Sequence, residues 1–161
     1  MLTKINPIRI YSNYLQPKSN NHISFTSDTF EYSTESNKEQ LMFDKLIKEM
    51  EDIVNQEHPN ANFKYPKAFK EYDSNEKLIN AGWSFPKGKN FLTNRMQDLK
   101  IVHNVDNLVP FAEDEEGSEI ACFILDNIQN EKVAVVWPFA NSENLYQGEY
   151  ENIPEWVEEG I

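Results

Sequence analysis

The stretch NLVPFAEDEEGSEIACFILDNIQNEKVAVVW, residues 107–137, decides the fold of this chain. Three apolar segments, 108–112, 119–125 and 132–137, alternate in it with short polar connections, which is typical of consecutive β-strands. Residues 119–125 are apolar at both alternating sets of positions, so this strand is expected to be covered on both faces. Pro110 has no amide donor and suits an edge strand or a strand start. We therefore predict an antiparallel meander rather than βαβ units.

Four consecutive acids, Glu113, Asp114, Glu115 and Glu116, separate the first two strands. They could be a catalytic pair, a metal loop, a docking surface for a basic partner, or the solvated tip of a hairpin. The spacing does not match a calcium loop, which needs alternating oxygen ligands and a distal glutamate. Gly117 supplies the freedom for a positive φ, and the acids keep the turn in water. We predict a hairpin tip, and a second use as a charged docking patch stays open.

A long amphipathic helix is predicted upstream, starting at Ser36, where Ser36 and Glu39 form a capping box. The helix is expected to end at His58–Asn60, around Pro59. Apolar residues follow at helical spacing and predict core packing: Phe43, Leu46, Ile47, Met50, Ile53 and Val54. Residues 8–11 and 22–26 read as two tentative strands in an N-terminal extension that spans 1–35.

Residues 66–82 predict two shorter helices, the first opened by Pro66. Asp73 or Ser74 is expected to cap the second helix, and Gly82 to end it.

The aromatic-rich segment 82–90 is expected to be a loop whose Trp83 and Phe85 tuck onto the core, with a ligand platform as the alternative. The pattern of residues 91–104 does not decide between a helix and a strand.

The tail ENIPEWVEEG, residues 151–160, predicts a short C-terminal helix capped by Asn152, with Pro154 in its first turn and Trp156 facing inward. There is no repeat, low-complexity tract or linker. We therefore expect one α+β domain over residues 1–161: an antiparallel sheet packed with an N-terminal amphipathic helix, shorter helices and a short C-terminal helix.

The formal net charge is −12 and the pI near 4.6, which disfavours binding to nucleic acid phosphates and anionic lipids. Cys122, the single cysteine, excludes an internal disulfide and is expected to be a buried small hydrophobe. His22, His58 and His103 share no metal-ligand spacing, and no phosphate-binding glycine motif or nucleophile elbow is present. We expect no metal, no cofactor and no membrane-spanning segment, and a cytoplasmic location.

The second half of the chain resembles the SUKH superfamily, which includes fungal cell-wall-assembly regulators and bacterial immunity proteins. The similarity covers residues 66–160 and is strongest over 107–137. The shared features are an apolar strand ending in Pro-Phe-Ala, an acidic glycine-containing turn, a strand with a central aromatic residue and a strand closing on tryptophan. They fall on Pro110, Phe111, Ala112, Asp114, Gly117, Phe123 and Trp137.

This resemblance implies a non-enzymatic binding domain, in bacteria an immunity protein that covers a cognate toxin, often a basic nuclease or deaminase. An acidic inhibitor would be steered towards such a toxin. The candidate contacts are Glu113, Asp114, Glu115 and Glu116 of the turn together with Trp137 and Phe139. Two alternatives stay open: a regulatory module that binds a cellular enzyme, and a hydrolase acting through carboxylates, one of which would need a raised pKa.

Overall fold

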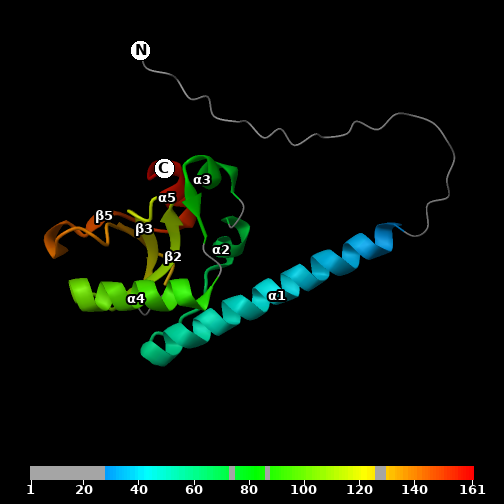
Figure 1. The fold of residues 1–161 in the computed structure, drawn as a ribbon, viewed down its shortest axis with the longest axis horizontal. Helices are drawn as coiled ribbons and strands as arrows, with labels where there is room; N and C mark the ends of the chain where they lie inside the picture. Colours follow the sequence, from blue (N-terminus) through cyan, green and yellow to red (C-terminus); the bar gives the residue numbers. More distant parts are fainter. Residues whose placement is uncertain (1–27, 73–74, 86–87, 126–129) are drawn as a thin grey trace, which may run out of the picture.

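The structure is a computed structural model that describes residues 28–72, 75–85, 88–125 and 130–161, with the backbone alone for 28–37. It confirms the expected α+β fold, in which helices pack with an antiparallel sheet (Figure 1). The elements in chain order are α1 (Asp28–Glu57), α2 (Lys67–Tyr72), α3 (Glu76–Asn80), β1 (Trp83–Ser84), α4 (Lys89–His103), β2 (Leu108–Asp114), β3 (Ile120–Ile124), β4 (Val133–Val136), the 3-10 helix η1 (Ser142–Asn144), β5 (Tyr146–Tyr150) and α5 (Ile153–Glu159).

In the described part of the chain the sheet has the order β1-β2-β3-β4-β5, and every neighbouring pair is antiparallel. The three strands expected from the sequence are β2, β3 and β4, so the predicted meander is confirmed. Strands β1 and β5 extend it at the two edges. The expectation that residues 82–90 form only a loop is therefore wrong, because Trp83 and Ser84 pair with Asp114 and Glu113. Such a two-residue strand depends on a distant partner and leaves no local pattern.

Pro110 lies within β2, opposite Cys122 of β3. Strand β1 reaches β2 only at its last two residues, so among the described residues no strand pairs with β2 on its outer side at Pro110. The missing amide donor therefore costs no ladder bond there. The register shifts between Pro110 and Ala112, which is a bulge that leaves Phe111 directed into the core.

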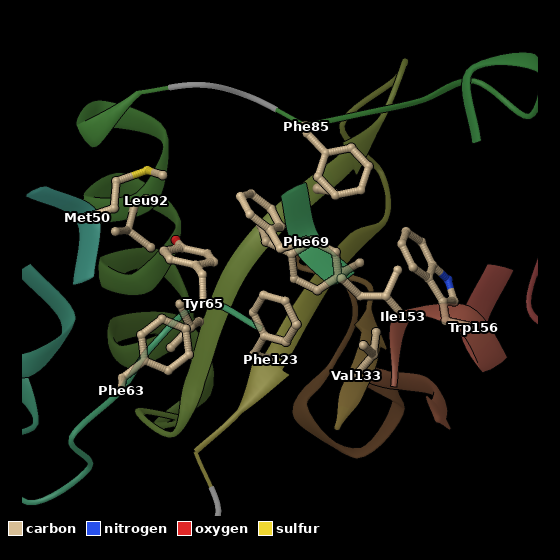
Figure 2. Close-up of a cluster of buried hydrophobic side chains, with 14 of the residues drawn as sticks. Met50, Phe63, Tyr65, Phe69, Phe85, Leu92, Phe123, Val133, Ile153 and Trp156 are labelled. Atoms are coloured by element: carbon tan, nitrogen blue, oxygen red, sulfur yellow. The ribbon is translucent and has the colours of Figure 1, made fainter. Parts of the chain in front are cut away.

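Both faces of the sheet are covered, as the apolar pattern of 119–125 predicted. On one face Phe111 stacks on Phe123 with ring centroids 4.2 Å apart. Aromatic residues from other elements pack in the same cluster around Phe123 (Figure 2). They include Phe63, Tyr65, Phe69, Phe85 and Trp156. On the other face Cys122 and its neighbours pack beneath Leu99 of α4 and Leu145. Complete burial raises the pKa of the Cys122 thiol, which fits a core side chain.

Helix α1 is longer than the sequence predicted. It begins at Asp28, so the predicted start at a Ser36–Glu39 capping box is wrong, and Ser36 lies inside the helix. No proline or glycine stands between Asp28 and Ser36 to interrupt the hydrogen-bond ladder. The predicted core stripe and the end before Pro59 are confirmed. The N-terminal part of α1 extends beyond the rest of the fold (Figure 1), and Leu41 and Met42 are exposed there.

The shorter helices form where the sequence placed them, as α2 and α3. The cap of α3 is Asn75, whose Oδ1 accepts from the amides of Lys77 at 3.0 Å and Leu78 at 3.3 Å. The predicted cap, Asp73 or Ser74, is therefore wrong, and those two residues lie outside the described ranges. Gly82 follows the helix with φ +81°, as its predicted role in ending it requires.

The C-terminal helix α5 is confirmed with its predicted cap, because Asn152 Oδ1 accepts from the Glu155 amide at 3.0 Å. Trp156 is fully buried and meets Trp83 edge-to-face. Residues 91–104, which the sequence left open, belong to α4. The two tentative strands at 8–11 and 22–26 lie outside the described residues.

Candidate functional site: an acidic and aromatic surface beside strand β5

The four acids predicted to form the hairpin tip are divided between two elements, so that prediction is wrong for two of them: Glu113 and Asp114 belong to β2 and pair with β1, whereas Glu115 and Glu116 lie in the turn to β3. Asp114 accepts hydrogen bonds from the Ser118 amide at 2.7 Å, the Ser118 hydroxyl at 2.6 Å and the Glu119 amide at 3.1 Å. Partial burial raises the pKa of Asp114, but hydrogen bonds from Ser118, Glu119 and Gly117 outweigh burial, so its pKa lies below the ordinary value. Asp114 therefore closes the turn, with Gly117 at φ +65°.

Of the other three acids, Glu113 forms an ion pair with Arg95 of α4 at 2.9 Å, with both side chains about a quarter exposed. Its charge is therefore compensated inside the molecule. Glu115 and Glu116 are exposed, so the predicted solvated tip is present. Glu115 lies over Gly82, on the α3 and β1 side of the turn. The structure thus does not gather the four acids into one patch.

Three exposed aromatic residues come together at the opposite edge of the sheet. Trp137 follows β4, Phe139 lies in the connection to β5, and Tyr146 begins β5; they are 46%, 79% and 44% exposed. Together with Ser118, Asn141 and Glu143 they line an open hollow of about 740 Å³. This set of residues, with Glu119, is called the β5 hollow below. Trp137 and Phe139 were candidates from the sequence, and the fold places both in it.

The connection that carries these aromatic side chains is fixed at its base. The Trp137 amide donates to the Leu145 carbonyl at 2.8 Å, and Leu145 is buried in the core. His103, at the end of α4, lies 2.8 Å through Nε2 from the Pro138 carbonyl. A carbonyl only accepts, so Nε2 carries the proton. The buried imidazole therefore ties α4 to the connection and has a structural role.

The charged groups at the β5 hollow are carboxylates, and they stand beside neutral polar side chains such as Ser118 and Asn141. Glu119 Oε1 accepts from the Trp137 indole Nε1–H at 2.9 Å, which sets the orientation of the ring. Glu143 lines the hollow and is exposed. No lysine or arginine lines the hollow in the part of the chain that the structure describes. The surface is therefore aromatic and negatively charged.

Sequence reasoning missed Glu119, Glu143 and Tyr146. Glu119 belongs to the same turn as the predicted acids, but only the pairing of Ile120 with Val136 brings it beside Trp137. Glu143 and Tyr146 stand in ENLYQG, which has no apolar periodicity. The local signal for Tyr146 was an aromatic residue in a polar segment where no core element was predicted.

The carboxyl groups with clearly shifted pKa values all shift downwards. The Lys70 ammonium lowers the pKa of Asp44, and the Lys89 ammonium lowers that of Glu49. Asp114 is the third, for the reasons above. These shifts hold the groups ionised, which suits the display of charge more than the donation of a proton. Among the described residues no group of three or more His, Cys, Asp or Glu side chains is arranged to hold a metal ion.

No protein-family model matches this chain, and no curated protein or solved structure shows significant similarity to it. Within the described ranges, no helix combines the length and the apolar character that crossing a bilayer requires.

Proposed function

We propose that this chain is a non-enzymatic binding protein of the SUKH type, which acts in the bacterial cytoplasm as an immunity protein against a basic toxin. The observation that carries this proposal is the β5 hollow. Its three exposed aromatic side chains stand at one edge of a sheet whose two faces are already covered. Aromatic side chains that the core does not use are the typical anchors of protein–protein interfaces.

The resemblance to the SUKH superfamily supports the same proposal. The features that carry it are strand and turn features, and each lies on an element of that kind. Pro110, Phe111 and Ala112 are in β2, Phe123 is in β3, and Trp137 directly follows β4. The acidic turn lies between β2 and β3 at the surface. These residues lie on or beside neighbouring strands of one sheet, and this is what supports the proposal.

The negative charge of the chain supports the proposal that its partner is basic. The net charge is −12, and the β5 hollow contributes carboxylates with no lysine or arginine among its described lining residues. Nucleases and nucleic-acid deaminases must attract phosphates and so present basic surfaces. An acidic protein that covers such a surface gains a fast association rate from long-range attraction.

The test is neutralisation of a toxin encoded beside this chain. The toxin domain is expressed in cells with the wild-type protein, with the double variant Trp137→Ala/Phe139→Ala, or with the matched control Leu41→Ala/Met42→Ala. The control removes apolar side chains of similar exposure from α1. We expect protection by the wild type and the control, and its loss with the double variant. Equal killing with and without the wild-type protein would contradict the proposal.

Measurements on purified proteins then show whether a loss of protection in cells comes from weaker binding or from lower expression. In a titration calorimetry experiment, the double variant should bind the toxin domain at least ~30-fold more weakly, because two central aromatic anchors are worth about 1–3 kcal/mol each. Circular dichroism should show unchanged folding, since both side chains lie outside the core.

A further inference from the structure

We infer that the β5 hollow receives an arginine side chain of the protein partner, an inference that rests on the proposed function. The relevant observation is the combination of three exposed aromatic side chains with two carboxylates, Glu143, which lines the hollow, and Glu119, which contacts Trp137. Aromatic walls alone would equally suit an apolar side chain, and carboxylates alone would suit any cation. Both together select a flat cation with an apolar stem.

The aromatic walls are available to a ligand. In the described part of the chain, the rings that stack on one another all belong to the core, and Trp137, Phe139 and Tyr146 are not among them. The exposed ring faces carry the negative side of the aromatic quadrupole, which attracts a guanidinium group placed over them. Tyr146 adds a hydroxyl, and partial burial, followed by the Glu149 carboxylate, raises the pKa of this group.

The carboxylates supply the charge. One carboxylate oxygen of Glu119 accepts a hydrogen bond from the Trp137 indole. Because the indole is neutral, this hydrogen bond does not compensate the negative charge of Glu119. Glu143 lines the hollow, is exposed and lies in the 3-10 helix η1. A guanidinium has five N–H donors in a planar fork, which can reach a carboxylate while its face lies on a ring. A lysine ammonium is a compact point charge that gains less from the flat walls.

The hollow is held in shape before a ligand arrives. The Trp137 ring is oriented by Glu119, the Trp137 amide is bonded to Leu145, and His103 holds the Pro138 carbonyl. Binding therefore loses little conformational entropy in the Trp137 side chain and the connection that carries it. A single bound side chain can contribute strongly to affinity when this entropy loss is small. The volume of about 740 Å³ accommodates an arginine together with neighbouring backbone of the partner.

The test uses short peptides and the full chain. Acetyl-Gly-Arg-Gly-amide is titrated against labelled protein while the Trp137 indole N–H signal is followed by NMR, with Trp137→Phe used to assign that signal. The matched ligand replaces arginine by citrulline, which has the same shape and no charge. We expect a saturable shift with arginine, and affinities roughly tenfold lower for citrulline and several-fold lower for lysine.

Two variants test the carboxylates. Glu119→Gln keeps an oxygen acceptor for the indole and removes the charge, and Glu143→Gln removes the charge of an exposed side chain outside the core. Each should weaken arginine binding about threefold or more, whereas Glu39→Gln, on exposed α1, should not. Equal shifts with arginine and citrulline, or no shift with either, would overturn the inference.

The outcomes also separate this inference from the proposed function. If the protein neutralises its toxin but does not distinguish arginine from citrulline, the hollow is not an arginine site and the proposed function stands. If arginine binds with the expected preference but the neighbouring toxin is not neutralised, the hollow recognises a cationic side chain of a different partner.

Discussion

The substitution Asp114→Asn tests whether the acidic turn is a structural device rather than a contact site. Asp114 accepts three hydrogen bonds, from the Ser118 amide, the Ser118 hydroxyl and the Glu119 amide. Asparagine keeps an acceptor at one oxygen, but its amide group replaces the oxygen that the Ser118 hydroxyl reaches, and the charge is lost. Because charge-assisted hydrogen bonds contribute about 1.5–3 kcal/mol, we expect a net loss of about 1–2 kcal/mol of unfolding free energy. The melting temperature should fall by roughly 2–8 °C.

The lowered pKa of Asp114 determines how the stability difference between wild type and variant should change with pH. The pKa of folded Asp114 lies below 3.8, whereas an unfolded aspartate titrates near about 3.9. A lowered folded pKa contributes stability that is fully present above the unfolded value and is lost as pH falls through the folded value. The stability difference between wild type and Asp114→Asn should therefore be largest near neutral pH and shrink as pH falls below about 4.

Urea denaturation at several pH values, followed by tryptophan fluorescence, measures this difference. The control is Glu116→Gln in the same turn, whose exposed side chain should change the unfolding free energy by less than about 0.5 kcal/mol. If Asp114→Asn matches the wild type at pH 7, or if its deficit is the same at pH 7 and pH 3, the carboxylate does not close the turn as argued.

Three further predictions follow from the same geometry. Gly117→Ala should cost about 1–2 kcal/mol in a denaturant titration, because φ is +65° and the new Cβ would lie 3.3 Å from the Arg95 guanidinium; an unchanged midpoint would contradict this. A double-mutant cycle of Arg95→Met and Glu113→Gln should give a coupling energy of about 0.5–1.5 kcal/mol for the partly buried pair, and strict additivity would show that the pair contributes nothing. Phe123→Ala should cost about 3–5 kcal/mol, since the side chain is fully buried, whereas Phe139→Ala, at 79% exposure, should stay within about 0.5 kcal/mol; similar losses would place Phe139 in the core.

The sequence could predict the central meander because its signals are local. Each of β2, β3 and β4 is an apolar run bounded by polar residues, and burial on both faces leaves a continuous apolar pattern. The cap of α5 was predictable for the same reason, since Asn152 and Glu155 are three residues apart. Where the local signal was ambiguous, the prediction failed: a capping box at Ser36 marks a possible helix start, but the chain upstream has nothing to stop the helix.

The candidate site was only half predictable. Trp137 and Phe139 were identified because their positions in the sequence were aromatic without a clear role in a core. The four acids looked alike in the sequence, yet Arg95 pairs with one and hydrogen bonds within the turn engage another. Glu119 became a site residue only through its contact with the Trp137 indole.

The sequence by itself determined the fold class, the central strands, the solvated acidic turn and the amphipathic face of α1, because apolar spacing and turn residues act within a few positions. Only the tertiary structure decided which acids find a partner within the fold, the pairing of β1 and β5 at the sheet edges, and the meeting of Trp137, Phe139 and Tyr146 around one hollow with Glu119 bonded to Trp137. The physical reason is that charge compensation and edge pairing depend on distances between segments far apart in the chain. Those distances are set by the packing of the sheet against its helices and leave no pattern in any one stretch of residues.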